Sequence, residues 1–421
     1  MHFQTEALHA GYTKDTQSTM AVPIYMTTAY EFRDVEHAAN LFSLKELGNI
    51  YTRLNNPTTD VFEKRFAQLE GGEAALATSS GMSAIFYAIA NAAEAGDNIV
   101  CASQLYGGSL TLFTHTLKRF GIEARFFDVQ TPKDAEKLID DRTKVLFFET
   151  LTNPSIDVAN ISALTEIADR YNIITVVDNT VATPALCRPF KHGVDVVVHS
   201  ASKYTTGQGL AIGGIMVERK NLVEKIKGNP RYVHFNEPDA SYHGLVYVDV
   251  PLPVYTLRAR LSLSRDLGAV SSPFNSWLFI QGLETLSLRM KEHSHNALML
   301  AEFLEKHPKV VKVNYPGLPS NSNYANAQRY FENGQASGLL SFEVAGFEQA
   351  KAIVDATKLF SLVVNIGDSK SIITHPASTT HQQLSEDELA ACGVPSGLIR
   401  LSAGLENVAD LIEDLSQALE A

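Results

Sequence analysis

The chain has 421 residues, about three times the modal size of a single domain, so more than one domain is expected. Its 47 acidic and 35 basic residues give a formal net charge of −12, which argues against non-specific nucleic-acid binding, since that requires a clustered basic surface. Hydrophobic residues make up 45% and charged residues 19% of the chain, as in ordinary globular proteins.

The cysteines and apolar runs narrow the class further. Cys101, Cys187 and Cys392 are odd in number and far apart, which favours neither a disulfide framework nor a CxxC metal or redox site. No stretch approaches the roughly 18 apolar residues of a membrane-spanning helix, and residues 1–6 do not begin a signal peptide. We therefore expect a cytoplasmic protein that does not bind membranes.

The hydrophobic pattern of the first half of the chain changes near residue 58. Residues 1–57 lack clear periodicity, and we expect an extended arm there with one short helix near residues 35–47. From about residue 60 to 220, short apolar runs alternate with helical stretches, which predicts an α/β fold with a mostly parallel sheet. The runs are 98–102, 145–149, 173–178 and 194–199, and the helical stretches include 107–120 and 160–171.

The second half contains a segment rich in turn-forming residues and then returns to alternation. Residues 228–251 hold two glycines and three prolines and are expected to form a long loop. A helix is expected from about 274 to 307, followed by alternating strands and helices at 339–344, 348–356, 398–402 and 408–419. The predicted domains are an arm (1–57), a large domain (58–270) and a C-terminal α/β domain (271–421).

Polar residues follow several predicted strands, at the sheet edge where ligands bind in such folds. Residues 77–83 (ATSSGMS) turn from a strand into an apolar helix, whose free N–H groups can bind a phosphate; an ordinary N-capping serine is the alternative. Asp178 ends a buried strand and needs a positive partner, such as a protonated ring nitrogen, unless it caps the next loop.

Two further strand ends carry reactive or planar side chains. Lys203 follows Ser200 and Ser202, whose hydroxyls could bind phosphate oxygens. A lysine amine in a desolvated pocket has a lowered pKa and can form a Schiff base, whereas a strand-end lysine that reaches solvent has no such role. Tyr106 precedes a helix start, where its ring can stack on a planar cofactor or simply pack.

Together these features predict one cofactor. A phosphate cradle, an aspartate for a pyridinium nitrogen, a stacking tyrosine and a Schiff-base lysine fit pyridoxal 5′-phosphate (PLP). Arg400 lies inside an apolar strand, where its guanidinium could bind an amino-acid carboxylate or form a structural ion pair.

Several motifs also occur in the order that one family shows. They are AVPIY (21–25), YTR (51–53) with NPT (56–58), VDNT (177–180), HSASK (199–203), QGLETL (281–286), HPA (375–377) and RLS (400–402). With them the chain resembles, from end to end, the cystathionine γ-synthase-like family of fold-type I PLP enzymes, and within it the O-acetylhomoserine sulfhydrylases. The resemblance implies an aspartate aminotransferase-like fold whose large domain (58–270) binds PLP.

The resemblance also implies a role for each matching residue. PLP would be bound by Lys203, Asp178, Tyr106, Gly81, Met82, Ser200, Ser202 and Asn153, and by Tyr51 and Arg53 of the neighbouring subunit. The catalytic residues would be Lys203 and Tyr106, and the substrate would be bound by Arg400, Asn365 and Asn153. The arm would reach the neighbouring subunit, in a homotetramer built from dimers with shared active sites.

Departures from other members of the family narrow the expected activity. Residues 365–371 read NIGDSKS where lyases and synthases usually have SLGGxES, and the insert contains SYHG (241–244); both are similar to the sulfhydrylases. Lys370 replaces a glutamate that could receive the amino group of cysteine, so a small sulfur nucleophile is expected. The expected reaction is a γ-replacement in which O-acetyl-L-homoserine and a sulfur donor give L-homocysteine and acetate, for methionine biosynthesis.

Several alternatives remain at this point. Within the family they are cystathionine γ-synthase and methionine or cystathionine γ-lyase. A nucleotide-binding dehydrogenase lacks its fingerprint, because Ile212 stands where the third glycine would follow Gly207 and Gly209. A non-catalytic descendant need not keep Lys203. No metal is expected, since the 13 histidines include no HExxH. The sequence leaves open the leaving group and the sulfur donor, which could be sulfide, a thiol or a sulfur-carrier protein.

Overall fold

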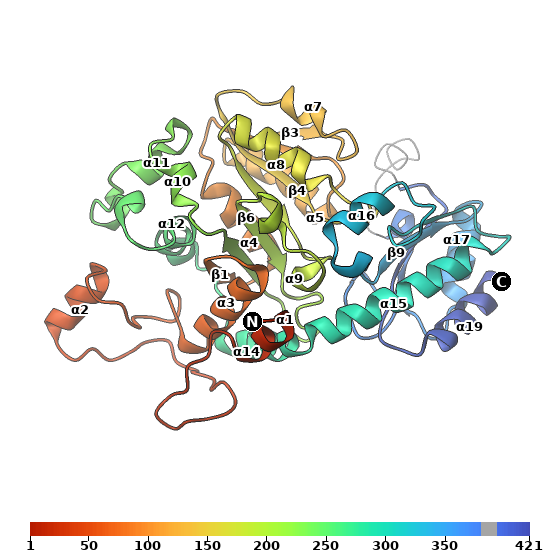
Figure 1. Cartoon of the computed structure of the whole chain (residues 1–421), viewed down its shortest axis with the longest axis horizontal. Coiled ribbons are helices and arrows are strands. Elements are labelled where there is room, and N and C mark those ends of the chain that lie inside the picture. Colours follow the sequence, from red (N-terminus) through yellow and green to blue (C-terminus); the bar gives the residue numbers. More distant parts are fainter. Residues whose placement is uncertain (380–393) are drawn as a thin grey trace.

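The computed structural model describes residues 1–379 and 394–421, and Cys392 lies outside these residues. Two α/β bodies, each built on its own sheet, lie side by side along the longest axis (Figure 1). Cys101 and Cys187 are both buried, and neither forms a disulfide bond. Among the described residues, no helix is long and apolar enough to cross a membrane.

A seven-stranded sheet forms the centre of the larger body, in the order β1-β7-β6-β5-β4-β2-β3, and only β7 runs against the others. The strands are β1 (Ala74–Thr78), β2 (Asn98–Ala102), β3 (Glu123–Phe127), β4 (Thr143–Glu149), β5 (Ile174–Asp178), β6 (Val196–Ser200) and β7 (Gly214–Glu218). The predicted mostly parallel sheet is confirmed. Strands β5 and β6 are nearly continuous valine and isoleucine runs because they are buried in the middle of the sheet.

Helices pack against this sheet, α3 against β1, α4 against β6 and β7, and α8 against β5. They are α3 (Pro57–Glu70), α4 (Gly81–Ala90), α5 (Gly107–Thr111), α6 (Leu117–Arg119), α7 (Lys133–Glu136), α8 (Ile161–Arg170) and α9 (Thr183–Leu186). The helical stretch predicted at 107–120 forms as α5 and α6 with a π-helical turn, Leu112–Thr116, between them.

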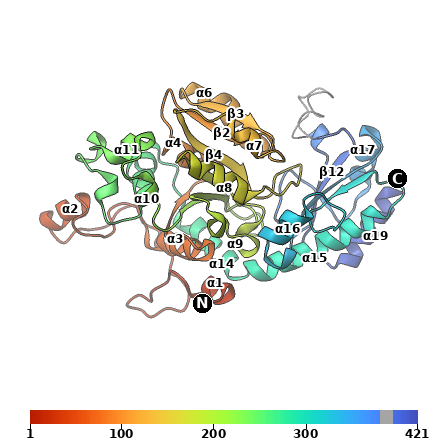
Figure 2. The same ribbon diagram turned by 45° about the horizontal axis from the view of Figure 1, so that its top comes forward.

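The N-terminal segment holds two helices, where the sequence predicted one. The expected helix is α2 (Val35–Phe42), which begins with Asp34 accepting a hydrogen bond from the His37 N–H. The missed helix, α1 (Phe3–His9), packs against α3 and buries Glu6, whose Oε1 accepts from Gln68 Nε2 at 3.0 Å. Tertiary contact with α3 stabilises this short helix, and no periodicity in seven residues could have shown it. In both ribbon views α2 lies far from α1 (Figures 1 and 2).

The segment 228–251 is not the loop that its glycines and prolines predicted. It folds into short helices whose aromatic side chains Tyr232, Phe235 and Tyr247 are fully buried. These anchors fix the segment on the larger body and override the turn-forming composition. The short helices are Pro230–Tyr232, α11 (Val233–Asn236), Ala240–Tyr242 and Tyr247–Asp249, flanked by α10 (Val223–Ile226) and α12 (Val254–Arg258) with its π-helical extension Ala259–Ser264 and α13 (Arg265–Leu267).

The helix predicted from 274 to 307 is two helices, α14 (Pro273–Glu284) and α15 (Leu286–Glu305), broken at Thr285 (φ −109°, ψ 5°). The break lets each helix pack separately: α14 contacts α3 of the larger body, whereas α15 contacts β8 and β9 of the smaller one. In Figure 1, α15 runs from the larger body to the smaller. The domain boundaries at 57/58 and 270/271 stay predictions.

The smaller body is built on a five-stranded sheet in the order β10-β11-β12-β9-β8. Its strands are β8 (Lys312–Asn314), β9 (Leu339–Glu343), β10 (Ser361–Leu362), β11 (Ile372–Thr374) and β12 (Leu398–Ser402). Its helices are α16 (Tyr324–Tyr330), α17 (Phe347–Ala356) and α19 (Val408–Leu419), with 3₁₀ turns at Glu332–Gly334 and Pro376–Ser378. Strand β12, predicted at 398–402, lies in the middle of the sheet, which buries Arg400.

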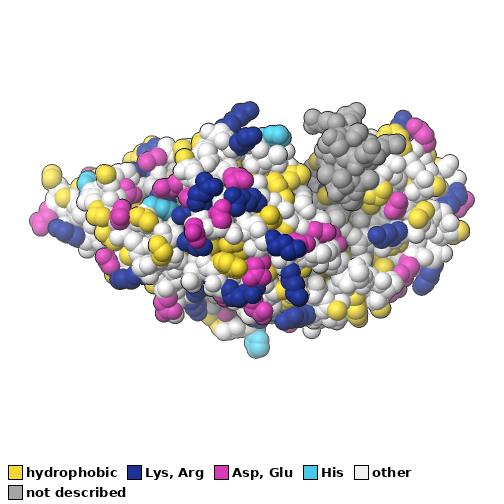
Figure 3. Space-filling view, turned by 90° about the horizontal axis from the view of Figure 1, so that it is seen from above, with side chains coloured by type: hydrophobic (Ala, Val, Ile, Leu, Met, Phe, Trp, Pro, Cys, Tyr) yellow, Lys and Arg dark blue, Asp and Glu magenta, His cyan; other side chains and the backbone are white. Residues whose placement is uncertain are grey.

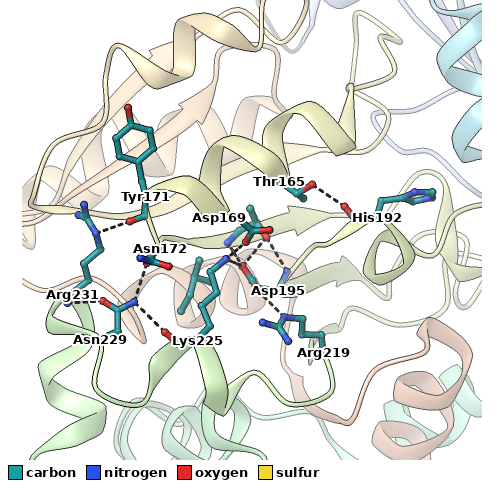
Figure 4. Close-up of polar contacts among 12 residues, drawn as sticks. Thr165, Asp169, Tyr171, Asn172, His192, Asp195, Arg219, Lys225, Asn229 and Arg231 are labelled. Carbon is teal, nitrogen blue, oxygen red and sulfur yellow. Dashed lines mark hydrogen bonds and ion pairs between the residues drawn. The ribbon is translucent and has the colours of Figure 1, made fainter.

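A buried carboxylate fixes the amino ends of the central strands (Figure 4). Asp195 accepts hydrogen bonds from the Thr175 N–H at 2.9 Å, from Arg219 Nε at 2.8 Å and from Lys225 Nζ at 2.7 Å. These contacts join β5, β7 and α10 at one edge of the sheet. The opposite, carboxyl edge is left free for a ligand.

Candidate active site

A cavity of about 860 Å³ opens at the carboxyl edge of the large sheet. The ends of β4, β5 and β6 and the starts of α4 and α5 line it from the larger body, and residues 364–366 and Arg400 line it from the smaller. It brings together ten of the predicted site residues: Gly81, Met82, Tyr106, Asn153, Asp178, Ser200, Ser202, Lys203, Asn365 and Arg400.

One end of the cavity has the chemistry of a phosphate site. Helix α4 begins there, and Ser80 caps it by accepting from the Ser83 N–H at 3.1 Å, which leaves the N–H groups of Gly81 and Met82 without intrahelical acceptors. Ser200 faces the same space from the end of β6. A Cβ at Gly81 would lie 2.6 Å from the Ser200 Cβ, so only glycine lets the helix start and the serine meet. Such a helix start suits a phosphate.

Lys203 is half-buried in the same cavity, and its Nζ donates a hydrogen bond to Asn365 Oδ1 at 2.6 Å. Burial lowers the pKa of the Lys203 amine, and the positive charge of Arg400 lowers it further. Both effects increase the neutral, nucleophilic fraction of the amine. The prediction of a desolvated lysine is therefore supported over a strand-end lysine in solvent.

Asp178 ends β5 beside Glu149 at the end of β4, and the two are paired in the parallel register. The Asp178 carboxylate accepts from the Thr180 N–H at 2.8 Å, and burial raises the pKa of Asp178. In the described part of the chain, no ion pair involves Asp178. Asp178 is half-buried, and a protonated ring nitrogen would supply the cation that its carboxylate lacks.

Arg400 enters the cavity from β12 and is held by neutral groups. Its Nη1 donates to Asn153 Oδ1 at 2.9 Å and its Nη2 to the Asn365 carbonyl at 3.2 Å. Burial lowers the pKa of Arg400 to about 10. Among the ion pairs of the described residues none involves Arg400, which argues against the structural ion pair and leaves the guanidinium free for a carboxylate.

Tyr106 lines the cavity at the start of α5, with 48% of its surface exposed. Its backbone N–H donates to Glu149 Oε1 at 2.7 Å. Its ring lies over Gly108, where an added Cβ would be 2.5 Å from a ring carbon. A half-exposed ring at a cavity wall can stack on a planar cofactor.

Tyr51 and Arg53 do not line the cavity of their own chain. Both are exposed on the N-terminal arm, where the Arg53 guanidinium lies 5.5 Å from the centre of the Tyr51 ring. Their assignment to a neighbouring subunit's site stays a prediction.

Glu149 and Thr180 are two of the polar lining residues to which the sequence analysis gave no role. Glu149 ends an apolar strand just as Asp178 does, so the same reasoning could have identified it. Thr180 connects two strand ends, since its N–H donates to Asp178 and its Oγ1 accepts from the Ser200 N–H at 2.8 Å. No group of three or more potential metal ligands occurs in the described ranges.

The outer surface contrasts with the cavity. Seen from above, basic and acidic side chains are intermixed over the described part of the molecule (Figure 3). Inside the cavity, Lys203 and Arg400 face a helix N-terminus and two acids, Glu149 and Asp178. A net charge of −12 therefore coexists with a site suited to a small anion.

A phosphate cradle, an acid in need of a cation and an amine of lowered pKa, all at the carboxyl edge of one sheet, match the needs of PLP. The fold and the cavity together define a PLP-dependent enzyme of fold type I.

Comparisons with known proteins identify the group within that class. The profile of the Cys/Met metabolism PLP-dependent enzymes matches residues 4–420, and the chain belongs to this family. It is similar to the O-acetyl-L-homoserine sulfhydrylase of Leptospira meyeri, at 49% identity over 99% of this chain and 96% of the relative. It is also similar to the homocysteine synthase of Schizosaccharomyces pombe, at 45% identity over 100% and 98%.

Solved structures agree with this membership. A crystal structure assigned as an O-acetylhomoserine (thiol)-lyase of Campylobacter jejuni superposes with a TM-score of 0.98 at 52% identity, and each chain is covered completely. That structure carries a pyridoxyl-lysine phosphate at its position 205. A second member, from Corynebacterium glutamicum, has a TM-score of 0.85 at 31% identity, covering 100% of this chain and 98% of the other. PLP is thus the cofactor of this chain's family.

Proposed function

We propose that the protein catalyses a γ-replacement in which O-acetyl-L-homoserine and a small sulfur nucleophile give L-homocysteine and acetate, a step of methionine biosynthesis. The names of the Leptospira and Schizosaccharomyces relatives, which match nearly the whole chain, support this reaction. The observation that carries the proposal is the position of the Lys203 amine, 2.6 Å from Asn365, whose backbone carbonyl accepts from Arg400.

Arg400 is the proposed clamp for the amino-acid carboxylate. Its partners in the chain are an amide, a carbonyl and the Thr374 hydroxyl, which are neutral acceptors that a carboxylate can replace through paired, charge-assisted hydrogen bonds. Asn153 and Asn365 hold the guanidinium from two sides, so the clamp is already oriented.

Lys203 is the proposed base that takes protons from Cα and Cβ of the substrate. Burial and the charge of Arg400 lower the pKa of its amine, which suits a base near neutral pH. When bound, PLP supplies an electron sink for the negative charge left at Cα, and Asp178 would keep its ring nitrogen protonated. Tyr106, which lines the same cavity, is the proposed proton donor to the leaving acetate.

The other proposed cofactor contacts are Gly81, Met82, Ser200 and Ser202 at the phosphate and Asn153 beside the ring. Ser202 is already oriented, because its Oγ accepts from the Gly213 N–H at 2.9 Å. Tyr51 and Arg53 would complete the phosphate site from the neighbouring subunit, in a homotetramer. That assembly, a cytoplasmic location and a sulfur-carrier partner rest on the sequence alone.

The choice of a small nucleophile follows from the segment after Asn365. Lys370 stands where related synthases have a glutamate, and it is exposed and lies outside the lining of the cavity. The cavity therefore lacks a carboxylate from this segment that could hold the amino group of cysteine.

Product analysis separates this reaction from the other activities of the family. Purified holoenzyme is incubated with O-acetyl-L-homoserine and sulfide, then with cysteine, and then with neither. Homocysteine that forms with sulfide, without cystathionine from cysteine or 2-oxobutanoate from the substrate alone, is the expected result. Cystathionine as the main product, or rapid 2-oxobutanoate release, would overturn the proposal.

A further inference from the structure

Glu149 is a buried acid in the cavity wall to which the proposed reaction gives no role. It ends β4, is only 4% exposed, and stands beside Asp178 in the register of the sheet. Its Oε1 accepts a hydrogen bond from the backbone N–H of Tyr106 at 2.7 Å. The carboxyl group thus connects the sheet edge to the first residue of the loop-to-helix turn that carries the tyrosine.

The surroundings of Glu149 favour its neutral form. Within the described ranges none of the ion pairs includes Glu149. The groups around it are the Asp178 carboxylate on β5 and the backbone groups of Tyr106, just before α5, and of Asn153, whose hydrogen bonds lower its pKa. Lys203 and Arg400 face the same cavity but bond to Asn365 and Asn153. Burial and the charge of Asp178 raise the pKa of Glu149 well above its usual range. Burial raises the pKa of Asp178 as well, but hydrogen bonding from Thr180 and the nearby His199 lower it, so Glu149 is the acid of the pair that favours the neutral form.

The ring of Tyr106 is constrained from the other side as well. Tyr106 has an extended backbone (φ −52°, ψ 134°), and its side chain makes no capping bond to α5. Helix α5 holds the Tyr106 carbonyl, which accepts from the Leu110 N–H at 3.0 Å, while Glu149 holds the Tyr106 N–H. Gly108 leaves room for the ring, because a Cβ there would lie 2.5 Å from a ring carbon. The bond to Glu149 and the space at Gly108 together determine where the ring lies.

We propose that Glu149 is a positioning residue that fixes the backbone of Tyr106 so that its ring covers the cofactor. The neutral form accepts the Tyr106 N–H without adding a second negative charge beside Asp178. This inference rests on the proposed function, because it assumes that Tyr106 stacks on PLP. Glu149 itself touches neither substrate nor the reacting atoms.

Two substitutions of Glu149 distinguish its hydrogen bond to Tyr106 from its ability to carry a negative charge. Glu149→Gln keeps the length of the side chain and an acceptor oxygen but cannot ionise, whereas Glu149→Asp keeps the acid but is one methylene too short to reach the Tyr106 N–H. Each apoenzyme is titrated with PLP, and the dissociation constant is read from the visible absorbance. We expect Glu149→Gln to stay within about twofold of the wild type and Glu149→Asp to bind about tenfold more weakly, as the loss of one hydrogen bond implies.

The pH dependence supplies a readout that a purely structural role would not change. As the pH rises from 7 to 9, the wild-type dissociation constant should rise relative to that of Glu149→Gln, because only the wild type gains a charge beside Asp178. The titration properties of free PLP are common to both proteins and cancel in this ratio.

The opposite ranking, with Glu149→Asp close to the wild type and Glu149→Gln weak, would overturn the inference, as would equal affinities for all three proteins. Circular dichroism of each apoenzyme checks the fold. If Glu149→Asp does not fold, Glu149→Gln alone still tests the inference. Wild-type PLP affinity in Glu149→Gln at pH 7 would support it, because this variant would bind PLP weakly if a negative charge at Glu149 were essential. A ratio of the two dissociation constants that does not change with pH would count against the neutral form. PLP binding is measured without substrate, so a failure of this inference differs from a failure of homocysteine synthesis by the wild type.

Discussion

Lys203 Nζ donates a 2.6 Å hydrogen bond to the side-chain oxygen of Asn365, across the boundary between the two bodies. The backbone carbonyl of Asn365 also accepts from Arg400. One residue of the smaller body therefore positions both the amine that serves as base and the guanidinium that binds the carboxylate. The two bodies must be in contact for either group to be oriented.

Replacing Asn365 by aspartate should raise the pKa of Lys203, because a carboxylate near an amine favours the ammonium form. The acid limb of the pH profile of kcat should move up by about one unit, and kcat at pH 7 should fall by about tenfold, because kcat reports the groups of the substrate complex, in which Lys203 acts as base. Asn365→Ala is the matched control, since it removes the acceptor without adding charge. An unshifted acid limb in Asn365→Asp would contradict the role of Asn365.

Removing the guanidinium of Arg400 should weaken substrate binding and leave the cofactor in place. Arg400→Ala should lower kcat/KM for O-acetylhomoserine by about 100-fold, since two charge-assisted hydrogen bonds are lost. Arg400→Lys keeps the charge but loses the paired hydrogen bonds, so its kcat/KM should lie between those of the wild type and Arg400→Ala. The visible spectrum of the holoenzyme should not change. A normal KM in Arg400→Ala would exclude the carboxylate clamp.

Adding a methyl group at Gly81 should push α4 away from Ser200, because the new Cβ would lie 2.6 Å from the Ser200 Cβ. We expect Gly81→Ala to weaken PLP binding by at least tenfold and to destabilise the protein by about 1–3 kcal/mol. Gly346→Ala is the control, because a Cβ there would meet nothing within 4 Å. Equal affinities in an absorbance titration of both variants would contradict the phosphate cradle.

His293 should make the protein less stable in mild acid. Its Nδ1–H donates to the Ala403 carbonyl at 2.7 Å, and its buried Nε2 has no partner among the described residues. Burial lowers the pKa of His293 to about 4 from 6.5. The neutral form of His293 therefore contributes fully to the free energy of unfolding above pH 6.5, and this contribution is lost as the pH falls toward 4. The loss between pH 7.5 and 5 is about 2 kcal/mol.

Urea unfolding of the holoenzyme at these two pH values measures that loss. The variant His293→Gln cannot be protonated and should lose about 2 kcal/mol less free energy of unfolding over the same interval. An identical pH dependence in the wild type and the variant would show that His293 does not titrate in this way.

The features of the structure that the sequence predicted are those in which burial determines the residue types. The valine runs of β5 and β6 could lie only inside a parallel sheet, and therefore the positions of Asp178 and Lys203 at its carboxyl edge followed. Arg400 was placed correctly for the same reason, because a guanidinium inside an apolar strand needs a partner in the interior.

What the sequence could not predict depends on contacts between distant segments. Helix α1 forms because Glu6 meets Gln68, and the insert at 228–251 is ordered by buried aromatic residues such as Tyr232. Glu149 could have been found from its place at the end of an apolar strand, but its partner, the Tyr106 N–H, is 43 residues away and could not have been predicted. Tyr51 and Arg53 form no contact with the cavity of their own chain, so their role depends on a second subunit.

The central claim is that the Lys203 amine carries the cofactor in this cavity, and borohydride reduction followed by peptide mapping tests it most directly. Reduction of the PLP-loaded protein fixes the cofactor to whichever amine holds it, and mass spectrometry locates the modified lysine. The account predicts a pyridoxyl group on the peptide containing Lys203 and none in Lys203→Ala, which should also make no homocysteine. A pyridoxyl group on another lysine, or homocysteine synthesis by Lys203→Ala, would contradict it.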